Sequence, residues 1–231
     1  MTVINAGTAD GTNCFLGLSP GAFQGGFSYQ TTDAANVATG TPDTPATIAQ
    51  NATQTFVFAV TPSVVLSQVE LGIQARCDQG TGSGVVVGVN SFILSSDKLA
   101  PSDMLTIGLT TTGDGVVSIP GSSGSAPASI ATSALGGGGI LKLSADDGGK
   151  GLPLLLFVCE TDPVTGLCLA NPVSELTLTS ANGETRTFGV FANATGDIPF
   201  DPAGSRIFVR FKDSLGVVRG ATNFAVRTDA P

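Results

Sequence analysis

The sequence contains no histidine. Histidine is the residue that most often serves as a general base near neutral pH and as a ligand for transition metals. Its absence excludes a Ser-His-Asp triad, a Cys-His nucleophile, and the zinc and iron sites that need an imidazole ligand. We therefore expect no cofactor and no catalysis that depends on histidine.

Tryptophan is also absent, and Tyr29 is the single tyrosine. Sugar-binding modules commonly stack pyranose rings on exposed tryptophan or tyrosine side chains. Carbohydrate binding by this chain would have to use Asp, Asn and backbone groups instead. It stays open as an alternative function.

No apolar run is long enough for a membrane helix. The longest, Leu152 to Cys159, is far shorter than the roughly 20 residues that such a helix requires, and it is typical of a buried strand. The N-terminal sequence MTVINAGTADG has neither a charged n-region nor an apolar h-region. We expect no transmembrane segment, and we expect that an export signal has been removed ahead of Met1.

Charge is scarce and mostly negative. Charged residues make up 12% of the chain, and the formal net charge is −8. The electrostatic field of a negatively charged protein repels the polyanionic backbone of a nucleic acid, so no nucleic-acid partner is expected. Residues 1–100 and residues 101–231 each carry −4, so neither end forms an acidic or basic tail.

What the chain does contain is typical of many short strands. The 31 glycines and 13 prolines are scattered between apolar runs. Within these runs apolar residues alternate, as in Phe56, Phe58 and Val60, which predicts half-buried strands. Residues 206–213 and 217–228 flank the turn sequence DSLG and predict an antiparallel hairpin. No stretch shows a useful helical period, so the fold class is all-β.

An internal repeat is indicated by matches at an offset of 132 residues, the distance from Phe56 to Phe188. The same offset aligns GVNSFIL with GATNFAV, and so places Phe92 on Phe224. We predict two tandem immunoglobulin-like β-sandwich domains, residues 1–97 and 98–231. A single larger jelly roll is the alternative.

The four cysteines favour two disulfides, because an even count fits an exported protein. The spacing within CETDPVTGLC favours a local Cys159–Cys168 bridge, which leaves Cys14 with Cys77, a bridge comparable to the inter-sheet one of immunoglobulin domains. A four-cysteine zinc site would need closely spaced C-x₂₋₄-C pairs, and none is present. The bridges predict a secreted or cell-surface location.

Two groups of carboxylates are candidate sites. Asp197 and Asp201 flank a loop that could hold calcium through carboxylate and carbonyl oxygens, although the dense acidic pattern of dedicated calcium loops is missing. Asp146 and Asp147 are adjacent and followed by glycines, which is typical of a solvated turn. A pair of carboxylates can hydrolyse glycosides without histidine, so a glycoside hydrolase fragment is the enzymatic alternative.

A local excess of basic residues lies near the C-terminus. Arg210 and Lys212 should share the face of their strand opposite the apolar residues, and we expect Arg227 to lie near them; Arg219 belongs to the same group. One interpretation is a solvated sheet face that discourages edge aggregation. The other is an interaction surface for an acidic partner or a neighbouring subunit.

Several segments together resemble a known group of proteins. They are GTADGTNCFLG, FVFAVTPS, DGVVSIPGSSG, CETDPVTGLC and PFDPAGSRIFVRFKDSLGVVRGATNFAVRT. The sequence is similar to uncharacterised bacterial secreted or cell-surface proteins built from immunoglobulin-like β-sandwich modules. The resemblance implies export and a non-catalytic role, and it assigns no functional residues.

The sequence therefore predicts a non-catalytic extracellular or cell-envelope module that acts in adhesion, binding or surface assembly. One alternative is a subunit of a filament or surface layer, in which an extended segment such as MTVINAG completes a neighbour's open sheet edge. The other is a carbohydrate-binding domain or a carboxylate-dependent glycoside hydrolase fragment. The expected partners are proteins at the cell surface or further copies of the chain.

Overall fold

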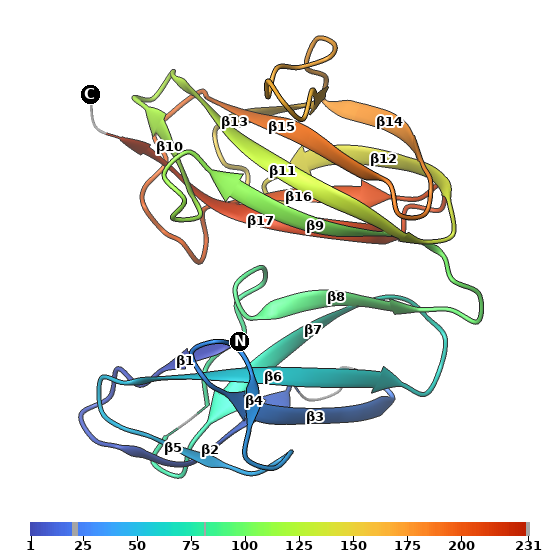
Figure 1. Cartoon of the computed structure of the whole chain (residues 1–231). Helices are drawn as coiled ribbons and strands as arrows, with labels where there is room; N and C mark the ends of the chain where they lie inside the picture. The colour runs from blue at the N-terminus through green and yellow to red at the C-terminus, as the bar shows by residue number, and fades with distance from the viewer. Residues whose placement is uncertain (20–22, 81, 230–231) are drawn as a thin grey trace. The chain divides into compact units, whose positions relative to one another are not determined.

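The computed structural model describes residues 1–19, 23–80 and 82–229, and in these residues it contains strands and no helix (Figure 1). The part described therefore holds no helix with the length and apolarity to cross a membrane. The all-β fold class predicted from the sequence is confirmed. The chain divides into two compact units, Met1–Ser96 (unit 1) and Asp97–Pro231 (unit 2).

Unit 1 is built from two antiparallel sheets. Their orders are β1-β6-β3-β4 and β5-β2-β7-β8. The strands described are β1 (Thr2–Ile4), β2 (Gly11–Leu18), β3 (Gly25–Thr32), β4 (Ala38–Thr39), β5 (Ala46–Ile48), β6 (Thr53–Pro62), β7 (Leu66–Arg76) and β8 (Ser91–Ser96). The core between the sheets includes Phe56 of β6 and Ile73 of β7. Phe58 of β6 contacts Phe92 of β8 across the two sheets, with ring centroids 5.6 Å apart.

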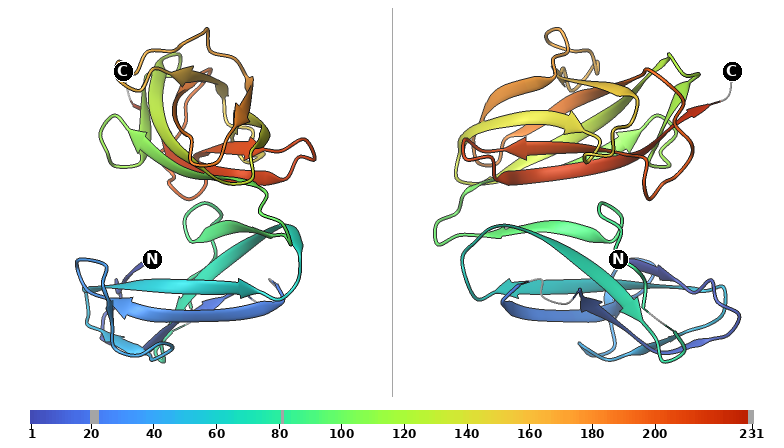
Figure 2. Two further views of the ribbon diagram at one scale, coloured as in Figure 1. Left: turned by 45° about the vertical axis from the view of Figure 1, so that its right-hand side comes forward. Right: turned by 180° about the vertical axis from the view of Figure 1, so that it is seen from behind.

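Unit 2 also has two sheets, which face one another in Figure 2. Their orders are β13-β15-β11-β9 and β10-β17-β16-β12-β14. The strands described are β9 (Ser102–Thr110), β10 (Val116–Pro120), β11 (Ser125–Gly136), β12 (Gly139–Asp146), β13 (Leu154–Thr161), β14 (Glu175–Ser180), β15 (Thr185–Ala194), β16 (Arg206–Lys212) and β17 (Val218–Asp229). β16 and β17 form the antiparallel hairpin that the sequence predicts.

The core of unit 2 follows from alternation along its strands. Ile207, Val209 and Phe211 on β16 are all fully buried, whereas the residues between them are half-buried. Phe188 of β15 meets Phe211 edge-on, with ring centroids 5.4 Å apart, so this pair joins the two sheets. Such aromatic contacts add to the free energy gained by burying the rings.

The two units share one strand order. Seven strands of unit 1 have an equivalent in unit 2. The order β1-β6-β3 in one sheet of unit 1 corresponds to β11-β15-β13, and the order β5-β2-β7-β8 in the other sheet corresponds to β14-β12-β16-β17. The equivalent strands also follow one another along the chain in the same order. Phe56 and Phe188 lie on the equivalent strands β6 and β15, and Phe92 and Phe224 lie on β8 and β17. The repeat inferred from the 132-residue offset is thus a structural repeat.

Each unit contains one disulfide, and the pairs are those that the sequence favours. Cys14 is bonded to Cys77, and Cys159 to Cys168. The comparison of Cys14–Cys77 with an inter-sheet bridge is wrong. Cys14 lies on β2 and Cys77 directly follows β7, and these two strands are paired neighbours within one sheet.

Removal of the two disulfides should have unequal effects on stability. Loop-closure entropy predicts a loss of about 4 kcal/mol for Cys14→Ala with Cys77→Ala, and about 2.5 kcal/mol for Cys159→Ala with Cys168→Ala. The difference arises because the first bridge closes 63 residues and the second closes 9. Urea unfolding of the two double variants measures it, and a larger loss for the Cys159–Cys168 pair would contradict the entropic explanation.

Candidate interaction surfaces

The segment that opens with Cys159 and runs to Val173 forms a loop closed by the Cys159–Cys168 disulfide, here called the stapled loop. After β13 the chain turns at Asp162, whose carboxylate accepts hydrogen bonds from the N–H groups of Val164 and Thr165 at 2.9 and 2.8 Å. These donors hold the pKa of Asp162 below its usual value, because they stabilise the charged carboxylate. Gly166 closes the turn with a positive φ of 71°. The sequence around Asp162 therefore specifies a tight turn.

The return arm of the stapled loop runs back along β13. Val158 and Val173 exchange backbone hydrogen bonds of 2.7 and 2.9 Å, and Leu169 N donates to Glu160 O at 2.9 Å. The Cys159–Cys168 bond fastens this arm to the strand. The arm therefore covers the outer edge of β13, which would otherwise present unpaired backbone groups.

The tip and return arm expose large apolar side chains. Val164 is 92% exposed, Leu167 70% and Leu169 64%. These three residues are here called the apolar tip. Clustered exposed apolar side chains on a fixed scaffold are typical of interaction sites. Sequence analysis identified the staple and missed the tip, although the apolar residues Val164, Leu167 and Leu169 within and beside a turn were a signal for it.

A second apolar surface lies on β9. Leu105, Ile107 and Leu109 point outward with exposures of 54%, 63% and 61%. Gly108, on the inward side of β9, has no room for a side chain because β17 lies against it. A Cβ on Gly108 would come within 2.6 Å of the Phe224 ring. Leu105, Ile107 and Leu109 consequently face away from the core, whereas Met104 at the start of β9 is buried in it. Alternation alone could not show which face of this strand is buried.

The basic residues near the C-terminus are largely neutralised within unit 2. Arg210 forms an ion pair with Asp146 and stacks on Phe208, with its guanidinium 4.7 Å from the ring centroid. Arg219 binds the Asp213 carboxylate at 2.8 Å. Lys212 forms no ion pair within the described part of the chain. The group therefore carries less free positive charge than the sequence suggests.

Arg227 does not join the other basic residues, so that expectation is corrected. Arg210 lies opposite Ala221, and Arg227 follows six residues later on β17, roughly 20 Å along the strand. Its side chain pairs with Asp229 at 3.0 Å and lies over Phe200. The hairpin register, which sequence alternation does not specify, separates the two ends of the predicted surface.

The calcium candidates show no assembled site. The Asp201 carboxylate accepts a hydrogen bond from Ala203 N at 3.2 Å and its backbone carbonyl accepts one from Ser205 N, so this residue shapes its own turn. Over the described ranges, no group of three or more Asp, Glu, His or Cys residues could hold a metal ion, at Asp197 or elsewhere.

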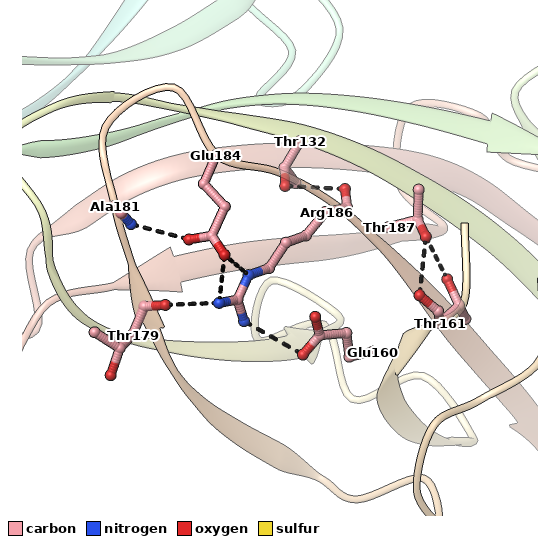
Figure 3. Close-up of polar contacts among 8 residues, drawn as sticks. All are labelled: Thr132, Glu160, Thr161, Thr179, Ala181, Glu184, Arg186 and Thr187. Atoms are coloured by element: carbon pink, nitrogen blue, oxygen red, sulfur yellow. Dashed lines mark hydrogen bonds and ion pairs between the residues drawn. The ribbon is translucent and has the colours of Figure 1, made fainter. Parts of the chain in front are cut away.

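A cluster of polar contacts surrounds Arg186 at the start of β15 (Figure 3). The guanidinium of Arg186 donates to Glu184 at 2.7 Å and to Glu160 at 3.3 Å. It also donates to the carbonyl oxygen of Thr179 at 2.9 Å, and Thr179 belongs to the opposite sheet. Arg186 on β15 thus links β13 of its own sheet to β14 of the opposite sheet.

The electrostatics of this cluster favour a structural role. The N–H of Ala181 and the Arg186 side chain both donate to Glu184 and hold its pKa below the usual value. A glycosidase general acid needs a raised pKa. The other carboxyls with displaced pKa values, Asp114, Asp147, Asp162 and Asp213, are displaced downward as well.

Comparison with known proteins gives no family. No family model matches the sequence, and no curated protein does either. Among solved structures, the chain is similar to the CupB6 tip adhesin of Pseudomonas aeruginosa, with 10% identity, a TM-score of 0.32, and coverage of 96% of this chain and 86% of that one.

Two further solved structures show similarity at the same level. The major pilin subunit BcpA of Bacillus cereus has 9% identity and a TM-score of 0.32, with 94% of this chain and 70% of that one covered. The BSP domain of a biofilm-associated protein has 11% identity and a TM-score of 0.29, with 96% and 54% covered. Likeness of this degree does not bear on function.

The lowered carboxyl pKa values predict acid sensitivity. A carboxyl whose pKa is lower in the folded state stabilises the fold above its unfolded pKa, about 4.5 for Glu184, and this stabilisation is lost as the pH falls below that value. Arg186→Met should lower the unfolding free energy at pH 7 and weaken its decline between about pH 5 and pH 3.

Lys142→Met is the matched control, because the Lys142–Glu175 pair is half exposed at 51% and 49% and should contribute little. Urea unfolding at pH 7, 5 and 3.5 compares both variants with the unchanged chain. Equal effects of the two substitutions would contradict the structural role of Arg186.

Proposed function

We propose that the chain is a non-catalytic extracellular or cell-envelope module that acts in adhesion or binding, and that both units are immunoglobulin-like sandwiches. The architecture is supported by unit 2. The orders β9-β11-β15-β13 and β12-β16-β17 follow the ABED and CFG arrangement of an immunoglobulin constant-type sandwich, with β10 and β14 added at the edges. Seven of the nine strands of unit 2, all but β9 and β10, have equivalents in the same order in unit 1.

The observation that carries the binding role is the apolar tip. Val164 and Leu167 lie on a turn fixed by the Asp162 carboxylate, and Leu169 follows the disulfide at Cys168. An apolar group held in one conformation loses little conformational entropy on binding, so its burial contributes directly to affinity. The site suits an apolar partner surface.

The extracellular location is supported by the two disulfides. Each described cysteine is oxidised, and none is free. Disulfides form and persist in oxidising compartments. In unit 2 the disulfide closes a short surface loop and does not join the two sheets, which fits a binding role for that loop.

The absence of catalysis is supported by how the carboxylates are used. Asp146 pairs with Arg210, Glu160 and Glu184 share Arg186, and Asp162 and Asp213 cap turns. Each of these groups is engaged in holding the fold. A carbohydrate-binding role through Asn or backbone groups is the alternative from another class.

A filament subunit is a second candidate, but not with the N-terminal donor segment that the sequence suggests. Thr2–Ile4 already pairs with β6 in its own unit. Met1 N donates to Phe56 O at 2.8 Å, and Asn5 N donates to Ala52 O at 2.9 Å. The expectation that MTVINAG is free to complete a neighbour's sheet is therefore corrected.

Retention on chemically defined surfaces tests the binding role. The chain is passed over gold coated with methyl-terminated or hydroxyl-terminated alkyl layers in a quartz-crystal microbalance. Combined Val164→Ser, Leu167→Ser and Leu169→Ser should lower retention on the methyl surface by about tenfold or more, because three apolar contacts are lost. Retention on the hydroxyl surface should be low for every variant.

The matched control replaces three other exposed apolar residues, Val37, Leu99 and Leu215, by Ser. Their exposures are 59%, 81% and 85%, comparable to those of the apolar tip. If this control loses as much retention as the tip variant, the chain adheres through general hydrophobicity and the proposed site is wrong.

A further inference from the structure

The structural repeat shows that two strands of unit 2, β9 and β10, have no equivalent in the described part of unit 1, and the position that β10 fills is therefore open there. In unit 2, β10 lies beside β17 and runs parallel to it, with Val116 opposite Ala225 and Pro120 opposite Asp229. In unit 1 the equivalent of β17 is β8, which lies at the edge of its sheet and pairs with β7 (Figure 1). No strand in the described part of unit 1 lies on the other side of β8.

The strand β10 completes the core of unit 2. Its inward side chains, Val117 and Ile119, are 3% and 0% exposed. The backbone of β17 also uses this neighbour, because Ala225 N donates to Gly115 O at 3.0 Å just ahead of β10. One short segment thus supplies both apolar contacts and hydrogen bonds to β17.

Burial differs between β8 and β17, because in unit 2 β9 packs on the Phe224 ring at Gly108 and β10 covers the edge of β17. Phe224, Ala225 and Val226 on β17 are 2%, 4% and 0% exposed. The residues 132 positions earlier, Phe92, Ile93 and Leu94, are half-buried, and no residue of β8 is fully buried. The side chains of β8 therefore keep apolar surface in contact with water that their equivalents in unit 2 do not.

β8 is also the longest edge strand among the described residues of unit 1. It has six residues, whereas the other edge strands β1, β4 and β5 have three, two and three. Its sequence, SFILSS, contains no charged residue and no proline. Charges, proline and shortness are the usual devices that prevent strand addition at an edge, and β8 lacks all three.

We propose that the open edge of β8 is a strand-acceptor site that binds an extended segment of a partner polypeptide other than a second copy of this chain, in the register that β10 adopts on β17. The segment runs parallel to β8, accepts a hydrogen bond from the Ile93 N–H as Gly115 does from Ala225, and buries apolar side chains at alternate positions against Phe92 and Leu94. Recognition of this kind takes affinity from the main chain and specificity from alternate side chains.

The chemistry of the ligand is read from β10 itself. The sequence VVSIP places Val117 and Ile119 inward, separated by the outward Ser118. A charged residue at either inward position would have to be buried without a partner. This site is separate from the apolar tip, so it does not depend on the binding role proposed for the stapled loop.

A labelled synthetic peptide with the sequence of residues 113–121, GDGVVSIPG, is the probe. Fluorescence anisotropy measures its binding to the full chain with both disulfides intact. A second peptide carries Asp in place of the residues equivalent to Val117 and Ile119. The first peptide should bind, and the second should bind about a hundredfold or more weakly, because two buried apolar contacts are replaced by charges.

Ile93→Pro in the chain removes the N–H that the peptide needs. Proline is tolerated on an edge strand where the N–H faces solvent, and Ile93→Val is the matched control that keeps the donor. Ile93→Pro should abolish peptide binding while Ile93→Val retains it. If Ile93→Pro fails to fold, protection of the Ile93 amide from hydrogen exchange on adding the first peptide replaces this comparison.

Three results would overturn the proposal. They are no binding of the first peptide at millimolar concentration, equal binding of both peptides, and binding that leaves Ile93→Pro unaffected. Sedimentation of the chain alone identifies the remaining occupant: concentration-dependent association that Ile93→Pro abolishes would mean that a second copy fills this edge, and it would overturn the assignment to a different polypeptide.

Discussion

The parallel pairing of β10 with β17 is the contact on which the closure of unit 2 depends. It buries Val117 and Ile119 and, together with β9, whose Gly108 lies against the Phe224 ring, it encloses Phe224 and Val226 on β17 almost fully. Unit 1 repeats seven of these strands in the same order, but its described part contains no equivalent of β9 or β10. The edge of β8 is therefore left with a row of unpaired backbone groups and an apolar strip.

The edges of the two units are treated differently, and this bears on function. In unit 2 the edge of β13 is covered by the return arm of the stapled loop, which the Cys159–Cys168 bond holds in place. The same loop exposes the apolar tip on a turn fixed by Asp162. One disulfide thus closes a sheet edge and fixes the loop for which we propose a binding role, and disulfides persist in oxidising compartments.

Much of the fold could be predicted from the sequence because it depends on local pattern. Alternation identifies the buried face of β16, cysteine spacing favours the observed pairs, and the match of Phe56 with Phe188 identifies the repeat. The basic and apolar surfaces could not be predicted from the sequence, because they depend on strand register and on contacts between strands that are distant in the sequence. Arg227 is separated from Arg210 by the hairpin register, and Leu105, Ile107 and Leu109 face outward because Phe224 occupies the space beside Gly108.

The central claim is that β8 has an unfilled neighbour where β17 has β10. Residue-resolved amide hydrogen exchange of the chain alone tests it most directly, because exchange protection reports whether a backbone N–H is engaged in a stable hydrogen bond. We predict strong protection at Ala225, whose N–H is bonded to Gly115 O, and fast exchange at the equivalent Ile93. Protection of Ile93 equal to that of Ala225, with no added strand, would contradict the account.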